Sequence, residues 1–235
     1  MNSVDVVVPV YNEESALARS VGILGDYLKK HITCRWQIVI ADNGSTDGTL
    51  AIAKELAGKY PFVRCVQLEL KGRGRALRKA WLESEADVVS YMDVDLSTNL
   101  DAFPELIGSL DAGNDIAIGS RLMPGSRVIG RSLKREITSR SYNLLIKALF
   151  APGIRDAQCG FKAVKREVAR DIVPFIKDQA WFFDTELLLL ARRRGYRIKE
   201  VPVEWADDPD TRVRVMRTAW EDVKGLLRVR FKPSF

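Results

Sequence analysis

Apolar runs and amphipathic segments alternate along most of this chain. The run at 4–10 is almost entirely apolar, which is typical of a strand covered on both faces. In the next segment Leu17, Val21 and Leu24 recur at helical spacing. The same pattern predicts further strands at 36–41, 63–70, 115–119 and 198–205, and one that begins at residue 88. It predicts helices at 13–30, 49–59, 132–150, 166–176, 184–194 and 211–230, and shorter ones around 76–81 and 103–110.

This alternation predicts an α/β fold, with a mostly parallel, twisted sheet and helices on both faces. No linker separates a second domain, so we expect 1–235 to form a single domain. Ligands of such sheets bind beyond the carboxyl ends of the strands. The polar clusters of this sequence lie at those ends, which favours a binding or catalytic role for them.

The stretch 88–98 carries the first candidate chemistry. Its apolar run ends on Asp93 and Asp95. Residues i and i+2 of an extended backbone point the same way, so these two carboxylates can converge on one ligand. A hard divalent cation would offset their charge, because such ions keep few protein ligands and share the oxygens of substrate phosphates. Solvated aspartates at a strand end are the alternative, and this stretch alone does not decide between the two.

Polar residues also follow the earlier strands. Tyr11 and Glu13 come after Pro9, and Asp42 follows the second strand. These residues would supply the aromatic wall and the hydroxyl acceptors that a nucleoside needs. A strand-to-helix turn and a helix N-cap are the alternatives. Gly72 begins a partial dinucleotide fingerprint that lacks its third glycine, so we interpret this loop as a basic helix start, suited to phosphates or to packing under a nucleotide.

Later segments add further candidates. Arg121 follows the strand at 115–119, where its guanidinium can hold phosphate oxygens. Asp156, Gln158 and Asp184 are candidates for a general base, and each is equally a cap or a buried hydrogen-bonding residue. The pattern does not choose between these roles.

The composition narrows the class of protein. The 235 residues are 46% hydrophobic and 29% charged, as in folded globular proteins. The net charge of +6 favours an anionic partner: a nucleotide, a nucleic acid or an acidic membrane surface. A single histidine, His31, argues against histidine triads and His-rich zinc sites. Three scattered cysteines indicate a reducing compartment.

Six segments, in this order along the chain, resemble those of the inverting family 2 glycosyltransferases. They are 9–14, 42–49, 93–95, 119–121, 155–162 and 183–187. Segments 155–162 and 200–205 most resemble the dolichyl-phosphate glucosyltransferases, and the mannose synthases are similar. The resemblance extends over residues 4–230.

The resemblance implies a GT-A fold, a nucleotide-diphosphate sugar donor (UDP-glucose or GDP-mannose), a divalent metal (Mg²⁺ or Mn²⁺) and a polyprenyl- or dolichyl-phosphate acceptor. It implies that Asp95, with Asp93, meets the metal, and that Arg121 and Arg131 hold phosphates near the acceptor. Ser97 stands where mannose synthases offer a glutamine to the metal, which leaves the coordination shell open. The positions it assigns to nucleotide binding are Pro9, Tyr11, Glu13, Asp42, Gly72, Asp93, Val94 and Arg212.

The function implied is transfer of a hexose to a polyprenyl phosphate with inversion at the anomeric carbon. A phosphate monoester has a second pKa of about 6 and is ionised at neutral pH. A general base is therefore optional, and Asp156 is retained as a candidate. Two alternatives stay open: a family 2 transferase acting on a glycan or protein hydroxyl, which needs a base, and a non-catalytic module that binds nucleotide sugars. Nucleic acid is disfavoured, because the aspartates would repel its phosphates.

The proposed acceptor lies in a bilayer, yet no apolar run approaches the ~18–20 residues that span one, and no signal peptide is visible. We therefore expect a peripheral enzyme at the cytoplasmic face of a membrane, unless a separate membrane-spanning partner recruits it. Segments 132–150 and 211–235 combine basic with apolar residues, as interfacial helices do. Packing on the sheet with a solvated basic face is the alternative. We expect 1–121 to bind the nucleotide sugar and 122–235 to face the acceptor and the membrane.

Overall fold

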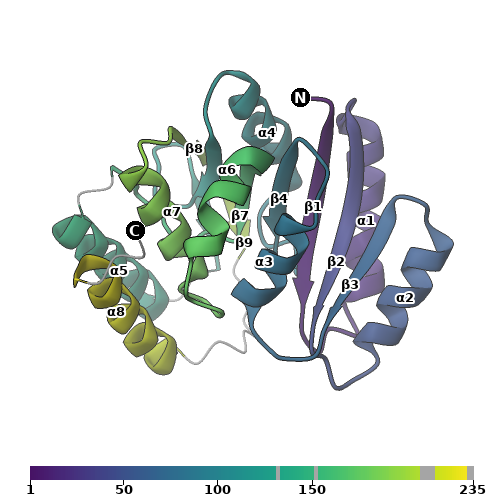
Figure 1. Ribbon diagram of the computed structural model, residues 1–235, viewed down its shortest axis with the longest axis horizontal. Helices are drawn as coiled ribbons and strands as arrows, with labels where there is room; N and C mark the ends of the chain where they lie inside the picture. The colour runs from purple at the N-terminus through teal and green to yellow at the C-terminus, as the bar shows by residue number, and fades with distance from the viewer. Residues whose placement is uncertain (131–132, 151–152, 207–214, 232–235) are drawn as a thin grey trace.

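A twisted seven-stranded sheet forms the centre of the computed structural model, which describes residues 1–130, 133–150, 153–206 and 215–231 (Figure 1). The strand order is β3-β2-β1-β4-β7-β5-β8. The strands are β1 (Ser3–Val10), β2 (Arg35–Asn43), β3 (Val63–Leu68), β4 (Val88–Met92), β5 (Ile116–Ser120), β7 (Phe161–Lys165) and β8 (Ile198–Pro202). β7 runs antiparallel to β4 and β5, and the other neighbouring pairs are parallel. The predicted α/β class with a mostly parallel sheet is confirmed.

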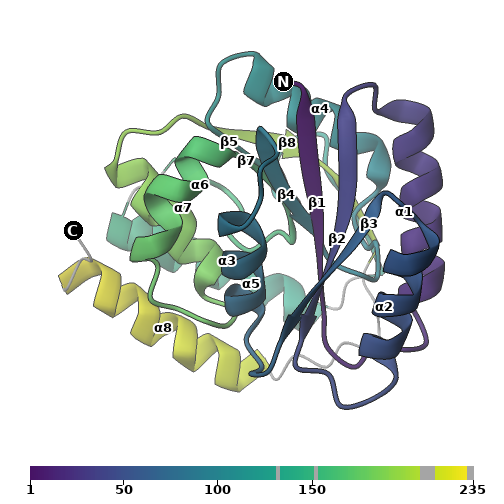
Figure 2. The same ribbon diagram turned by 45° about the vertical axis from the view of Figure 1, so that its right-hand side comes forward.

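Helices cover both faces of the sheet, as predicted (Figures 1 and 2). Alternate residues of β1 enter two separate cores: Val7 packs in one, and Val6 and Val8 in the other. The core around Val7 includes α3 (Arg73–Leu82), α5 (Leu133–Phe150), α6 (Arg166–Ile172), α7 (Phe183–Arg193) and α8 (Val215–Phe231). The other core includes α1 (Leu17–His31), α2 (Thr49–Lys59) and α4 (Phe103–Asp111). Two short 3-10 helices, η1 (Leu100–Ala102) and η2 (Val173–Phe175), flank α4 and α6.

Several predicted boundaries differ from those observed. The first helix begins at Leu17, not at residue 13, because residues 14–16 form a turn in which the Glu13 carbonyl accepts the Ala16 N–H (3.1 Å). The strand predicted at 198–205 is divided at Val203 into β8 and β9 (Glu204–Ala206). β9 pairs with β6 (Arg127–Ile129), where the sequence pattern predicts no strand, and together they form a second, two-stranded sheet. These short edge strands have too little apolar alternation to be recognised from sequence.

The carboxyl ends of the parallel strands meet at the lower edge of the sheet in Figure 1. Val10 and Asp42 are register partners at the ends of β1 and β2. Asp93 follows the end of β4, and Arg121 follows the end of β5. The sheet therefore brings the predicted polar clusters to one edge of the molecule.

Candidate active site

The loops after β1 and β2 are tied together by hydrogen bonds. Ser45 Oγ accepts a bond from the Asn12 N–H (3.0 Å), and Asn12 Oδ1 accepts one from the Thr46 N–H (2.8 Å). Glu14 Oε2 accepts a bond from the Gly48 N–H (2.7 Å). Asn12 has a φ of 56°, in the left-handed region that asparagine tolerates. The two loops thus form one polar surface from segments that are distant in sequence.

Tyr11 and Asp42 are at the strand ends that these loops join. The Lys71 ammonium is 3.5 Å from the centroid of the Tyr11 ring, a cation–π contact. Asp42 is buried, and its Oδ1 atom has no hydrogen-bond partner among the described residues. A buried acceptor without a donor is unfavourable by roughly 1–3 kcal/mol. This atom therefore suits a hydroxyl donor from a ligand such as a ribose.

Backbone groups dominate at three other positions predicted to bind the nucleotide. Pro9 is buried within β1. The Glu13 N–H donates a hydrogen bond to Thr49 Oγ1 (2.7 Å), at the start of α2. The Gly72 N–H donates one to Asn43 Oδ1, which joins the start of α3 to the end of β2. The structure brings these positions to the same strand ends as Tyr11.

The backbone turns directly after β4 and does not remain extended as we expected. The Leu96 N–H donates to the Asp93 carbonyl (3.1 Å), and Leu96 has a φ of 51°. Asp93 is half-buried, whereas Asp95 is exposed and its Oδ1 accepts the Ser97 N–H (3.0 Å). Val94, between the two aspartates, is buried. The turn therefore gives the two carboxylates different surroundings.

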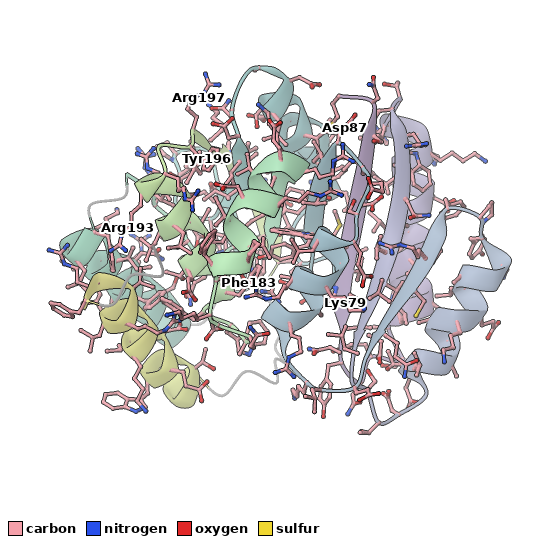
Figure 3. All side chains as sticks on the ribbon, viewed as in Figure 1. Lys79, Asp87, Phe183, Arg193, Tyr196 and Arg197 are labelled. Carbon is pink, nitrogen blue, oxygen red and sulfur yellow. The ribbon has the colours of Figure 1, made fainter. Side chains whose placement is uncertain are left out.

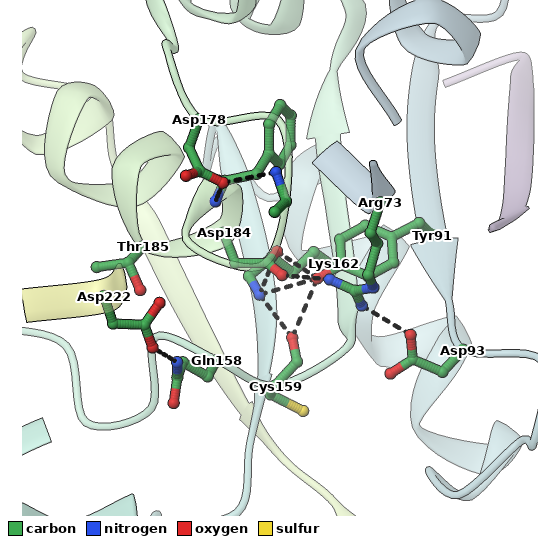
Figure 4. Close-up of polar contacts among 12 residues, drawn as sticks. Arg73, Tyr91, Asp93, Gln158, Cys159, Lys162, Asp178, Asp184, Thr185 and Asp222 are labelled. Carbon is green, nitrogen blue, oxygen red and sulfur yellow. Dashed lines mark hydrogen bonds and ion pairs between the residues drawn. The ribbon is translucent and has the colours of Figure 1, made fainter. Parts of the chain in front are cut away.

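Asp93 belongs to a buried network of charged groups (Figure 4). The Arg73 guanidinium bridges two carboxylates: Nη2 lies 2.7 Å from Asp93 Oδ1 and Nη1 lies 2.6 Å from Asp184 Oδ2. Lys162 Nζ lies 2.9 Å from Asp184 Oδ1, and the Tyr91 hydroxyl donates to the same oxygen. The basic side chain at the start of α3 therefore points inward and aligns Asp93.

The network keeps Asp184 ionised. Burial alone would raise the pKa of Asp184, but Lys162 and Arg73 lower it below its usual value. Both of its oxygens carry cationic partners, so this candidate base serves as an anchor for Arg73. No spacing in the sequence links these positions, because each comes from a different element.

Gly160 makes room for Asp93. A Cβ atom at position 160 would overlap Asp93 Oδ2 and approach the Arg73 guanidinium to 3.2 Å. Only glycine allows the chain before β7 to pass so close to this carboxylate. The 155–162 segment therefore packs directly against the end of β4.

Arg121 and Asp156 form the second ion pair of the site. Arg121 Nε lies 2.7 Å from Asp156 Oδ2, and its Nη2 lies 2.9 Å from Oδ1. The Arg121 N–H also donates to Oδ2 (3.0 Å), and the Gln158 N–H donates to Oδ1 (3.3 Å). The guanidinium carbon lies 4.9 Å from the centroid of the Trp205 ring. These contacts fix the orientation of the Arg121 guanidinium.

Asp156 is ionised and saturated with donors. Burial alone would raise its pKa, but Arg121 lowers it below the usual value. Each carboxylate oxygen has two lone pairs, and each receives two hydrogen bonds here. No acceptor position remains for a substrate proton. These contacts fix the Arg121 guanidinium against Asp156.

Asp95 is the residue predicted to meet the metal. Among the residues that the structure describes, no three histidine, cysteine or carboxylate side chains gather to bind a metal. Asp95 is an exposed carboxylate at the strand ends, and a hard cation can combine one such ligand with water and phosphate oxygens. Asp93 pairs with Arg73 through its Oδ1 atom.

Two predicted basic contacts lie outside the described residues. They are Arg131, predicted to hold a phosphate, and Arg212, predicted to contact the pyrophosphate. Their roles remain predictions. Arg121 is thus the predicted phosphate ligand whose position the structure provides.

The family is decided by a comparison with family models. The model of glycosyl transferase family 2 matches residues 5–173, a range that contains all the strand-end clusters described above. The chain belongs to glycosyl transferase family 2. The resemblance inferred from the six segments is confirmed.

Several curated relatives resemble this family 2 chain over most of its length. Glycosyltransferase AglD of Haloferax volcanii is 36% identical over 217 residues, which are 91% of this chain and 35% of AglD. Dolichyl-phosphate beta-glucosyltransferase ALG5C of Trichomonas vaginalis is 34% identical, over 89% of this chain and 65% of that protein. The dolichyl-phosphate beta-glucosyltransferase of Dictyostelium discoideum is 31% identical, over 97% and 73%. The chain thus spans less than two thirds of the first two relatives.

Solved structures establish the fold of this family 2 member. The glucosyl-3-phosphoglycerate synthase of Mycobacterium tuberculosis, in complex with Mn²⁺, UDP and glucosyl-3-phosphoglycerate, matches with a TM-score of 0.73 and 20% identity over 97% of this chain and 80% of that one. Its complex with Mn²⁺ and UDP-glucose matches with a TM-score of 0.71 and 20% identity, over 97% and 79%. The predicted GT-A fold is confirmed.

Proposed function

We propose that this chain transfers glucose from UDP-glucose to a polyprenyl phosphate of the dolichyl type, with inversion at the anomeric carbon. The names of two relatives, which are dolichyl-phosphate beta-glucosyltransferases, support the acceptor and favour glucose over mannose. The complex of a structural neighbour with Mn²⁺ and UDP-glucose supports the donor and the metal. We propose that residues 1–121 bind the nucleotide sugar and 122–235 receive the acceptor.

The observation that carries this proposal is the saturation of Asp156. A hydroxyl acceptor must lose a proton as it attacks, which requires a base within reach. Asp156 is the carboxylate beside Arg121, and its acceptor positions are already filled. A phosphate acceptor arrives ionised and needs no base. The pair therefore suits a phosphate better than a hydroxyl.

Each part of the site has a distinct role in this scheme. Tyr11 and Asp42 would hold the nucleoside, and the Asp93 carboxylate, aligned by Arg73, would lie beside it. Asp95 would hold Mg²⁺ or Mn²⁺, whose charge offsets the negative charge of the leaving diphosphate. Arg121 would hold the acceptor phosphate in line with the anomeric carbon, so that alignment accounts for much of the rate.

A panel of nucleotide sugars tests this function. With a short polyprenyl phosphate as acceptor, we expect label from UDP-glucose to enter the organic phase, and much less label from GDP-mannose. Polyprenol without the phosphate is the matched control and should remain unglucosylated. Transfer to the alcohol or to a soluble glycan, and none to the phosphate, would favour the hydroxyl-acceptor alternative.

The outer faces of α5 and α8 suit a membrane surface. No helix in the described part of the chain is long and apolar enough to cross a bilayer. The two helices lie side by side in both ribbon views and expose apolar with basic residues (Figures 1 and 2). On α5 the exposed residues include Ile137, Arg140, Leu144 and Lys147, and on α8 Trp220, Lys224, Leu227, Arg230 and Phe231. We therefore propose that the chain works at the cytoplasmic face of a membrane through these helices.

Vesicle flotation tests the membrane contact. The chain should float with anionic vesicles at low salt, and salt should weaken binding. Each basic residue near an anionic surface contributes roughly 1 kcal/mol to the free energy of membrane binding, or about fivefold in affinity. The variant Lys224→Gln/Arg230→Gln should therefore bind about 25-fold more weakly. Arg228 is unsuitable for this test, because it lies 2.6 Å from the buried Glu186 carboxylate.

The matched control is Lys54→Gln/Lys59→Gln on α2, two exposed lysines on the other side of the sheet. This variant should bind vesicles as the original chain does. Absence of flotation at low salt would exclude direct binding and leave recruitment by a membrane-spanning partner.

A further inference from the structure

The loop that carries Asp156 is held from behind by α5 and α8. The Ala157 N–H donates a hydrogen bond to Asn143 Oδ1 on α5 (3.2 Å). Gln158 Nε2 donates one to Asp222 Oδ2 on α8 (2.8 Å; Figure 4). Asn143 and Asp222 are both buried, with 4% and 3% exposed. Each helix therefore reaches the residues next to Asp156 with one buried polar side chain.

α8 is itself fixed to the core of the molecule. A Cβ atom at Gly225 would lie 2.5 Å from the Phe182 ring. Only glycine at this position lets α8 pack so close to Phe182, the residue before α7. Arg193, at the end of α7, extends toward α8 and donates to the Val229 carbonyl (2.8 Å; Figure 3). A helix attached in this way is a rigid support for the side chain of Gln158.

The polar anchors and the exposed apolar residues are on opposite faces of the same helices. On α5, Asn143 points inward, whereas its neighbour Leu144 is 67% exposed. On α8, Asp222 points inward, whereas Trp220 is 62% exposed. The inner faces therefore hold the loop while the outer faces suit a lipid surface.

Packing alone does not explain why a carboxyl group is buried at position 222. Its Oδ1 atom has no hydrogen-bond partner within the described residues. Burial, together with the charges of Asp178, Asp184 and Glu221, raises the pKa of Asp222 to about 7. An apolar side chain would fill this position with less desolvation. Its contact with Gln158 is what distinguishes Asp222 from such a side chain.

We propose that Asn143 and Asp222 are positioning residues. They hold the loop at 156–158 at a fixed distance from the outer faces of α5 and α8. This proposal rests on the proposed function. The acceptor phosphate projects from the lipid surface by a distance that its chemistry determines. If the Asp156–Arg121 pair is held at the same distance from the lipid surface as that phosphate, it binds the phosphate without rearrangement of the loop.

Acceptor and donor kinetics test the proposal. Asp222→Leu removes the oxygen that accepts the Gln158 amide, and Asn143→Leu removes the oxygen that accepts the Ala157 N–H. Loss of one hydrogen bond corresponds to about fivefold to tenfold in affinity. We expect each variant to raise KM for polyprenyl phosphate in anionic vesicles by that factor. The Kd of UDP-glucose, measured by calorimetry, should change by less than twofold.

Asp222→Asn keeps an acceptor oxygen for Gln158 and should restore the original acceptor KM. Ser141→Ala, at an exposed position of α5 two residues before Asn143, is the matched control and should change neither constant. If Asp222→Leu does not fold, Gln158→Leu removes the same bond from the side of the loop. A folded Asp222→Leu or Gln158→Leu variant with an unchanged acceptor KM would overturn the proposal. So would equal losses of donor and acceptor affinity, which indicate a general structural role.

Failure of the proposed function has a different signature. In that case the original chain itself transfers no glucose to polyprenyl phosphate, whatever the variants do. If the original chain is active, only the ratio of acceptor KM between variant and original decides the role of Asn143 and Asp222.

Discussion

Asp95→Ala should lower kcat/KM for glucose transfer by roughly three orders of magnitude while leaving the fold intact. A metal at this position supplies several kcal/mol of charge stabilisation to the leaving diphosphate. Asp95 is exposed and lies in a turn after β4, so its replacement opens no cavity in the core, although it removes the hydrogen bond from the Ser97 N–H. Activity and circular dichroism, measured on the same preparation, separate the two effects.

Chelation should act in the same way as the substitution. EDTA should abolish transfer, and Mg²⁺ or Mn²⁺ should restore it to the original chain but not to Asp95→Ala. Glu105→Ala removes an exposed carboxylate from the start of α4 and is the matched control, with unchanged activity. Full turnover in EDTA, or in Asp95→Ala, would contradict a metal at this position.

Arg121 and Asp156 should behave as one unit in a double-mutant cycle. We expect Arg121→Gln and Asp156→Asn each to lower kcat/KM by at least about 100-fold, since a misaligned group can lose that much rate. The double variant should be no worse than the more damaged single variant, because Asp156 acts only through Arg121. A general base would instead add its own 10²–10⁴-fold loss in the double variant.

The pH profile supplies an independent measurement. The pKa of Asp156 is held below its usual value, so the carboxylate is ionised throughout the neutral range and should give no acidic limb between about pH 5 and 9. The stability that the pair contributes is full above the pKa of an unfolded aspartate, about 3.9, and is lost as the pH falls below it. If the rate instead depends on an ionisation near neutral pH, and Asp156→Asn abolishes that dependence, Asp156 acts as a general base.

Folding must be checked in this cycle, because removal of one partner leaves a buried charge unpaired. Removal of one partner of a buried ion pair typically lowers the free energy of unfolding by about 3–5 kcal/mol. The double variant, with two neutral amides, should be more stable than either single variant. Arg155→Gln is the matched control: its guanidinium is half-exposed and lies 3.6 Å from Glu200 Oε2, an ion pair worth less than about 1 kcal/mol. It should change neither stability nor rate appreciably.

The sequence by itself determined the fold class and the edge of the sheet at which the chemistry lies. The apolar run of β1 is buried along its whole length, and the helix predicted at 49–59 coincides with α2. These predictions succeed because periodicity reports burial directly. Tyr11 and Arg121 do follow strand ends, whereas Asp42 is the second-last residue of β2; all three lie at one edge because parallel strands bring their carboxyl ends together.

Only the tertiary structure decided which of these groups interact. Arg73, Lys162 and Asp184 come from α3, β7 and α7, and no local rule predicts that they form one network, which reaches Asp93 through Arg73. The saturation of Asp156 likewise depends on a guanidinium 35 positions earlier in the chain. Periodicity identifies which residues are buried, but the partner of a buried charge depends on how the elements pack. That packing places the Arg121 guanidinium against Asp156, a contact that the sequence alone does not show.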